Sequence, residues 1–301
     1  MRSIFKISRP ISASRPPVAV ELAPEGLLAA TVSGSQMALS FAPLLAGVVE
    51  PGIAEANLKN PSAIAAALSR ALGELNPQGK ALTLVVPDSA VRVFVLDFDA
   101  FPSRRDEALP VLRFRLRKMV PFEVEVAGIG FQKLSESKTE CRVLAVVIPQ
   151  PVLAEYEQAI RAVGYEPGIV LPSTLAALGA VEGNGPALVV SLSAHTLTTA
   201  IVQANDLLLY RTVDLPADEA PRTEEIRRGI AVTSAYYEDK LITPPTKLLF
   251  IGPIPAAEFA RILDEPTLAV TELVERPATG AATPLGAMSI AALTGVLKGA
   301  A

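Results

Sequence analysis

The feature that most constrains the fold of this chain is an order of predicted elements that occurs twice. The first copy predicts three strands, a helix and a strand, at 18–22, 27–32, 36–41, 60–75 and 82–86. The second copy follows the same order, at 187–192, 197–203, 207–213, 223–241 and 247–252. Asn60 and Thr223 are the expected N-caps of the two helices. The repeated order predicts an α/β protein built from two similar halves.

A third unit lies between the two copies, over roughly residues 99–148. It predicts a charged helix that follows Ser103 and two strands near 127–134 and 141–148. Pro110 falls inside that helix and should either kink it or mark a later start. The sequence therefore predicts a helix-and-sheet insert that precedes the second half.

Composition excludes several classes of protein. The net charge of −4 argues against nucleic-acid binding, which favours a basic surface. One cysteine, Cys141, can supply neither an internal disulfide nor a zinc cluster. The uncharged stretches 183–205 and 277–297 are broken by polar residues or by glycine and proline, so neither should span a bilayer. Residues 1–17 are basic but lack the apolar segment of a signal peptide, and we expect a flexible leader and a cytoplasmic protein.

Four longer sequence segments indicate a more specific fold family. They are FPSRRDEALPVLRFRLRKMVPFEVE (101–125), CRVLAVVIPQPVLAEYEQAIRAVGYEPGIVLPSTLAAL (141–178), TEEIRRGIAVTSAYYEDK (223–240) and TPLGAMSIAAL (283–293). In order and spacing the chain resembles the type IV pilus assembly protein PilM family, in the FtsA and PilM branch of the actin-like ATPase superfamily. The cytoplasmic domain of the type II secretion protein GspL shares much of this arrangement and stays an alternative.

The resemblance implies an α/β, actin-like (ribonuclease H-like) duplicated fold. Its first domain would cover 18–182, with 99–148 as an inserted 1C-like subdomain, and its second domain would cover 183–301. Only residues 217–222 separate YRTVDLP (210–216) from the helix expected at Thr223. The helices that form a lid over the second domain in this superfamily are therefore expected to be missing.

The resemblance also implies an ATP site, and the sequence departs from it at each phosphate-binding or adenosine-binding turn. In the first turn Glu21 stands where the family has aspartate, and Pro24 removes an N–H donor. The second turn, SLSAHT (191–196), has Ser191 and Ser193 and lacks the expected aspartate and glycine. In the third turn Gly252 remains, but the second glycine of the family's pair is replaced by proline. We therefore predict a degenerate nucleotide site at Glu21, Ser191, Ser193 and Gly252, with no catalytic residue, cofactor or metal.

A protein without this chemistry is expected to act by binding. The resemblance implies a cytoplasmic scaffold of a pilus or secretion platform, held at the inner membrane by the N-terminal cytoplasmic tail of a PilN-like protein. Other platform proteins and the assembly ATPase are further candidate partners. The alternative from another class is an active ATPase or sugar kinase of the same fold.

The helix at 103–119 and the turn after it are the predicted contact surface for that tail. In the family the peptide groove lies between the first subdomain and the insert, and the resemblance places this helix beside it. Arg113 and Arg117 would orient the peptide, and Phe122 would line a pocket. The alternative is a half-buried helix whose charged rim is merely solvated.

Overall fold

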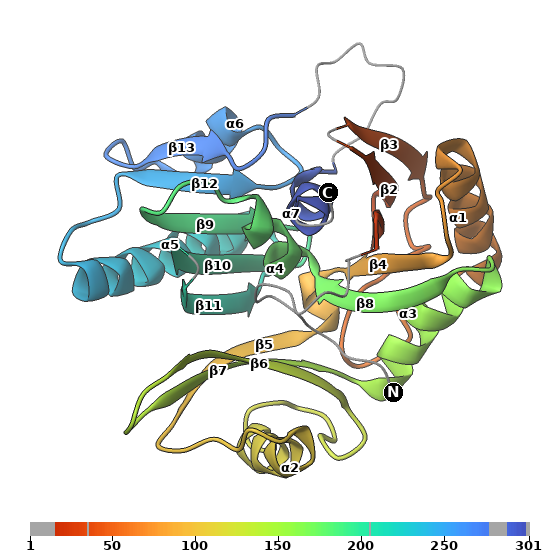
Figure 1. Ribbon diagram of the computed structural model, residues 1–301. Coiled ribbons are helices and arrows are strands. Elements are labelled where there is room, and N and C mark those ends of the chain that lie inside the picture. The colour runs from red at the N-terminus through yellow and green to blue at the C-terminus, as the bar shows by residue number, and fades with distance from the viewer. Residues whose placement is uncertain (1–15, 35, 205, 277–287, 299–301) are drawn as a thin grey trace.

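The computed structural model describes residues 16–34, 36–204, 206–276 and 288–298. Two halves lie side by side, and a smaller unit lies below them (Figure 1). Most of the predicted leader lies outside the described residues, as does the segment 277–287, which includes the first part of the string TPLGAMSIAAL (283–293).

The first half is a five-stranded sheet in the order β3-β2-β1-β4-β8. Its elements are β1 (Val18–Ala23), β2 (Gly26–Ser33), β3 (Gln36–Pro43), α1 (Pro61–Leu75), β4 (Ala81–Val86), α3 (Gln150–Ala162), β8 (Glu166–Pro172) and α4 (Ser173–Ala177). Strands β1, β2 and β3 pair antiparallel, whereas β4 and β8 run parallel to β1. The strands β1 and β4 are almost wholly buried, which is why their sequences are continuously apolar instead of alternating.

The second half repeats this sheet in the order β11-β10-β9-β12-β13. Its elements are β9 (Pro186–Leu192), β10 (Thr196–Gln203), β11 (Asp206–Asp214), α5 (Glu219–Leu241), β12 (Lys247–Ile251), α6 (Ala256–Leu263) and β13 (Ala269–Glu272). The last helix, α7 (Ala291–Leu297), packs against α4 and β1 of the first half. Three antiparallel strands are again followed by parallel ones. The predicted duplicated α/β fold is confirmed.

The two long helices begin differently from each other. Asn60 caps α1 as predicted, because its side-chain oxygen accepts a hydrogen bond from the Ala63 N–H at 3.0 Å. The prediction that Thr223 caps the other helix is wrong, since α5 begins at Glu219 and its N-cap residue is Asp218. Pro221 does not prevent the earlier start, because the N–H groups of a first helical turn have no partner within the helix. Only residues 215–218 connect β11 to α5, so no lid can be inserted there.

The insert forms a separate three-stranded sheet in the order β5-β7-β6, covered by one helix. Its elements are β5 (Arg92–Phe98), α2 (Arg105–Leu116), β6 (Gly128–Glu136) and β7 (Cys141–Ile148). The sheet therefore begins before residue 99, because β5 pairs with β7 along its whole length. Pro110 lies inside α2, near its middle.

The two faces of β7 pack against different parts of the molecule. Val143, Ala145 and Val147 share a core with the buried face of α2. Leu144, Val146 and Ile148, which alternate with them, belong to the large core that the two halves share. Because successive side chains of a strand point to opposite faces, the insert's sheet separates α2 from the two halves (Figure 1).

Candidate functional site

The turns that would bind phosphate in an actin-type site meet between the two halves. The β1–β2 turn contributes Pro24 and Glu25, and the β9–β10 turn contributes His195, to a cavity of about 630 Å³. The segment 44–51 forms the remaining wall and adds Glu50. The described lining residues thus include two carboxylates and no lysine or arginine, a charge balance that disfavours a bound triphosphate.

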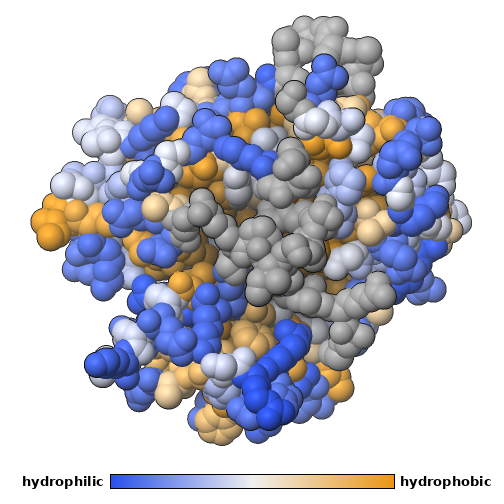
Figure 2. Space-filling model, in the orientation of Figure 1, coloured by the Kyte–Doolittle hydropathy of each residue, from blue (hydrophilic) through white to orange (hydrophobic). Residues whose placement is uncertain are grey.

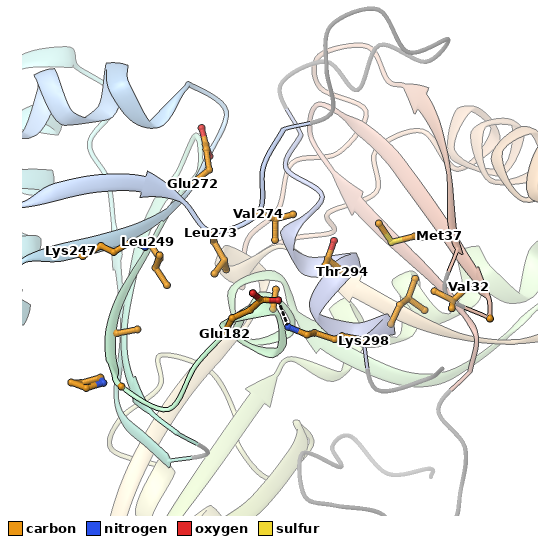
Figure 3. Close-up of a pocket in the computed structure, with 16 residues that line it drawn as sticks. Val32, Met37, Glu182, Lys247, Leu249, Glu272, Leu273, Val274, Thr294 and Lys298 are labelled. Carbon is orange, nitrogen blue, oxygen red and sulfur yellow. Dashed lines mark hydrogen bonds and ion pairs between the residues drawn. The ribbon is translucent and has the colours of Figure 1, made fainter.

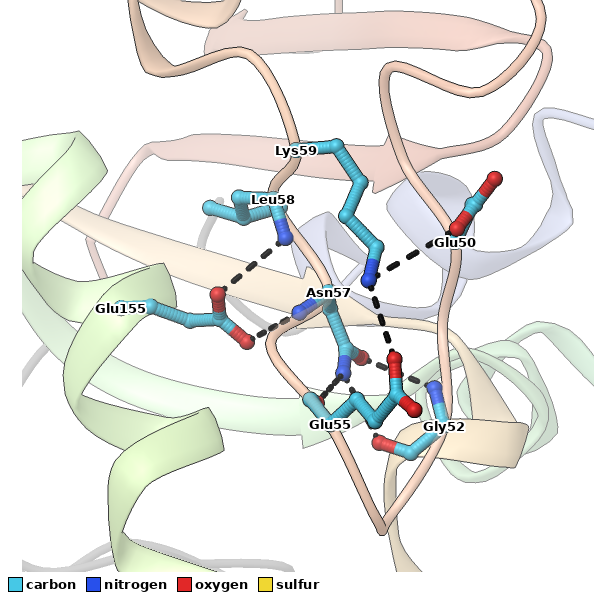
Figure 4. Close-up of polar contacts among 7 residues, drawn as sticks. All are labelled: Glu50, Gly52, Glu55, Asn57, Leu58, Lys59 and Glu155. Carbon is cyan, nitrogen blue, oxygen red and sulfur yellow. Dashed lines mark hydrogen bonds and ion pairs between the residues drawn. The ribbon is translucent and has the colours of Figure 1, made fainter.

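The wall of this cavity continues into a loop that is held by internal hydrogen bonds (Figure 4). Glu155 of α3 accepts hydrogen bonds from the backbone N–H groups of Asn57 and Leu58, at 2.7 and 3.1 Å. The Asn57 side chain is fully buried and bonds both backbone groups of Gly52. Lys59 pairs with Glu50 at 3.7 Å and so neutralises part of the charge of the cavity wall.

Glu21, the predicted counterpart of a magnesium-binding aspartate, is buried in β1. Ser173, the first residue of α4, donates a hydrogen bond to Glu21 Oε1 at 2.6 Å, and Oε2 has no hydrogen-bond partner among the described residues. Burial raises the pKa of Glu21 from 4.5 to about 7; the Ser173 hydrogen bond opposes this rise, and the nearby Asp88 and Glu25 add to it. A buried carboxyl group whose ionisation is disfavoured in this way is a weaker ligand for Mg²⁺ than an ordinary carboxylate.

Replacing Glu21 with glutamine should stabilise the protein in a pH-dependent way. Because the folded pKa is about 7 and the ordinary value is 4.5, the folded chain retains a proton that the unfolded chain releases between these pH values. Stability from this group is thus fully present below about pH 4.5 and is lost as the pH rises through about 7. Denaturant titration should show E21Q more stable than the native chain by about 3 kcal/mol at pH 8 and by about 1 kcal/mol or less at pH 5.

The control for this prediction is E224Q, which removes an exposed carboxylate from α5. Its stability relative to the native chain should not change between the two pH values. An equal gain for E21Q at pH 5 and pH 8 would show that Glu21 ionises as freely in the folded chain as in the unfolded one.

The hydrogen-bond donors and acceptors of the β9–β10 turn are already bonded within the protein. Ser193 Oγ accepts hydrogen bonds from the backbone N–H groups of His195 and Thr196, at 3.2 and 3.0 Å. Arg222 of α5 donates to the carbonyl oxygens of Ser193 and Ala194, each at 2.6 Å. The N–H groups that would contact a phosphate are therefore already engaged, and the nearby cation is committed to carbonyl groups.

The remaining predicted positions are held by packing. Ser191 is buried at the end of β9, where it pairs with Thr198 of β10 and Ile251 of β12. A Cβ atom at Gly252 would lie 2.4 Å from the ring of Phe250, so this glycine is required by a neighbouring side chain. Arg276 donates to the Gly252 carbonyl oxygen at 2.6 Å and so closes the third turn.

Asp88 is the most highly connected polar residue between the halves, and the sequence analysis missed it. Its carboxylate accepts hydrogen bonds from the Thr174 N–H at 3.2 Å and from the Thr174 hydroxyl group. From the second half it accepts bonds from the hydroxyl groups of Thr198 and Tyr210, at 3.3 and 3.1 Å. Burial raises its pKa, and the hydrogen bonds oppose that rise. An acidic residue two positions after the end of the buried strand β4 was the available signal, but its partners come from distant segments.

The predicted partner-binding residues are not brought to the boundary between the insert and the first half. Arg113 donates to the Val124 carbonyl oxygen at 3.4 Å, and Arg117 forms an ion pair with Glu125. Phe122 is half-buried against the insert's own core. All three belong to the α2 side of the insert, which the sheet separates from the first half.

A second cavity, of about 780 Å³, lies at the opposite ends of the strands from the phosphate turns (Figure 3). Both halves and α7 line it. Its apolar lining consists of Val32, Met37, Leu249, Leu273, Val274 and Leu297, together with alanine residues and Pro186. Glu182 and Lys298 form an ion pair at its edge, at 2.9 Å. No group of three or more histidine, cysteine or acidic side chains that could hold a metal occurs within the described ranges.

Comparison with solved structures identifies the fold. The chain is similar to a chain of the PilM–PilN type IV pilus biogenesis complex, with a TM-score of 0.73, 17% identity and coverage of 96% of this chain and 100% of that one. It is also similar to the cytoplasmic domain of EpsL, an inner-membrane component of the type II secretion system of Vibrio cholerae (TM-score 0.51, 12% identity, coverage 94% and 93%).

A third similar structure is a Bacteroides thetaiotaomicron protein of unknown function with an actin-like ATPase fold (TM-score 0.53, 10% identity, coverage 95% and 96%). No protein-family model and no curated protein sequence matches the chain. In the part of the chain that the structure describes, no helix has both the length and the apolar character needed to cross a membrane. The actin-like fold predicted from the sequence is confirmed.

Proposed function

We propose that this actin-fold chain is a non-catalytic scaffold, which binds the cytoplasmic tail of a PilN-like inner-membrane protein and is held at the membrane by it. The observation that carries the proposal is the state of the cleft between the halves. Arg222 holds the second turn and Arg276 the third, while Ser173 occupies the Glu21 carboxyl group in the strand before the first turn. A chain that keeps the two-part fold with these groups engaged internally is suited to binding a protein.

Similarity to PilM in the PilM–PilN complex supports the partner, because it extends over the whole fold, including the insert. Similarity to the EpsL cytoplasmic domain supports a platform of type II secretion as the second candidate setting. An active ATPase or sugar kinase stays the alternative from another class. The acidic cavity at the turns and the absence of room for a lid argue against it.

Mg-ATP binding separates the scaffold from the ATPase. Isothermal titration should detect no binding at micromolar nucleotide, because the N–H groups of the second turn are occupied and the cavity carries two carboxylates. Glu21→Asp should not restore binding, since Pro24 and the closed second turn remain. Micromolar affinity, or magnesium-dependent hydrolysis, would contradict the proposal.

The structure changes the residues that we expect to contact the tail. If the tail docks between the first half and the insert, it meets the face of the insert's sheet that is opposite α2. Val95 and Leu134 lie on that face, half-buried against the large core that the two halves share. An extended apolar peptide could cover them without disturbing the fold.

The test is titration of the chain with the cytoplasmic tail encoded by the neighbouring membrane-protein gene. Leu134→Asp should weaken binding by about tenfold or more, because it places a charge in an apolar contact. The triple change Arg113→Glu, Arg117→Glu and Phe122→Ala should leave affinity within about threefold, since those residues face away from the first half. Weakened binding by the triple variant together with normal binding by Leu134→Asp would support the sequence-based prediction for α2. Normal binding by both variants would mean that the tail docks elsewhere.

A further inference from the structure

The outward surface of α2 carries an aromatic side chain that no part of the described structure covers. Ala108, Leu112 and Leu116 form the buried face of the helix. Phe114 lies on the opposite side at helical spacing, and 76% of its surface is exposed. Met119 and Val126, in the segment that follows α2, are 41% and 58% exposed. Burying these apolar side chains would be favourable, so the surface is suited to binding.

Cationic side chains surround this aromatic residue. Between Leu109 and Met119 the sequence contains four basic residues and no acidic one, in a chain whose net charge is −4. The four are Arg113, Arg115, Arg117 and Lys118. Of these four, only Arg117 forms an ion pair within the described parts of the chain, with Glu125. Arg115 and Lys118 make no ion pair or hydrogen bond with the residues that the structure describes, so their charges are free to meet an external anion.

The shape of this surface indicates what it binds. Phe114 projects from the helix with 76% of its surface exposed, and neither of the two cavities described above includes a residue of α2. The lower edge of the molecule shows apolar atoms beside strongly hydrophilic ones in the region of α2 (Figure 2). A peptide ligand needs a groove with pockets, whereas a convex, cationic surface with an apolar centre fits the headgroup region of a bilayer.

We propose that the C-terminal part of α2 binds the surface of an anionic lipid bilayer, with Phe114 inserted among the headgroups and Arg115 and Lys118 paired with lipid phosphates. The apolar contact and the charge attraction act together, since neither alone gives stable binding at a membrane surface. The contact does not depend on the tail, because the tail site and Phe114 lie on opposite sides of the insert's sheet. It would orient a chain that a membrane protein already holds nearby.

Fluorescence tests this directly because the chain contains no tryptophan. Phe114→Trp supplies a single reporter at the proposed insertion point. With vesicles of phosphatidylglycerol and phosphatidylethanolamine, its emission should shift to shorter wavelength and be quenched by brominated lipids. Ile242→Trp, at a side chain 89% exposed near the end of α5, should show neither change. An unshifted emission from the Phe114→Trp protein with anionic vesicles at low salt would overturn the proposal.

Vesicle sedimentation of the full chain tests the charge requirement. The double variant Arg115→Glu, Lys118→Glu should lower the partition coefficient on anionic vesicles by about tenfold or more. The matched control is Arg70→Glu, Arg261→Glu, which changes net charge equally at exposed arginines of α1 and α6 and should bind as the native chain does. An equal loss of vesicle binding in both double variants would mean that the attraction is a non-specific effect of net charge. Native-like vesicle binding by the α2 variant would mean that another surface contacts the membrane. Either result would contradict the proposal, while tail affinity would separately decide the scaffold function.

Discussion

Asp88→Ala should destabilise the protein by about 2–4 kcal/mol, because it removes one acceptor that four buried donors share. Those donors are the N–H and hydroxyl groups of Thr174 and the hydroxyl groups of Thr198 and Tyr210. The cost is reduced because the native carboxylate is itself unfavourably buried, as its raised pKa indicates. Denaturant unfolding monitored by circular dichroism measures the change.

Two variants make this prediction specific. Asp97→Ala, which breaks a surface ion pair with Arg142, should cost about 0.5 kcal/mol. Asp88→Asn should lie between the two, because an amide keeps one acceptor oxygen and the threonine hydroxyl groups can rotate. If Asp88→Ala cost no more than Asp97→Ala, water would have to replace the carboxylate, and the two halves would not depend on it.

Gly295→Ala should destabilise the protein by about 2–3 kcal/mol, although alanine is the better helix former. A Cβ atom at Gly295 in α7 would lie 2.1 Å from the Ala176 carbonyl oxygen of α4. One at Gly179, in the turn that follows α4, would lie 2.4 Å from the Gly295 carbonyl oxygen. The two backbones therefore touch, and any side chain must push α7 away from α4 and the sheet behind it.

Gly73→Ala is the matched control, because a Cβ atom there meets no atom within 4 Å. This substitution in α1 should stabilise the protein by about 0.5–1 kcal/mol. The same chemical change should thus have opposite signs at the two helices. Thermal unfolding of both variants measures it, and a Gly295→Ala protein as stable as the native chain would mean that α4 and α7 can separate at little cost.

The order of the elements could be predicted because it depends on local patterns. Alternating or continuous apolar runs between turn residues predict strands, and the apolar residues of α5 at Ile226, Ile230 and Tyr237 share one buried face as expected. The loss of the lid could also be predicted, because a connection limited to 215–218 has no length for it. The effect of Pro24 could be predicted as well, because a proline lacks a backbone N–H donor whatever the tertiary structure around it.

Only the tertiary structure decided which faces and which distant groups meet. Leu144 and Val143 are adjacent in an apolar strand, and no local pattern tells which of them faces the two halves and which faces α2. The family resemblance placed α2 beside the boundary between the first half and the insert, but the insert's sheet separates the helix from the two halves. Asp88 likewise depends on Thr174, Thr198 and Tyr210, which lie 86, 110 and 122 residues further along the chain. Periodicity reports how a segment divides between buried and exposed sides, but the partner of each side is determined by long-range packing.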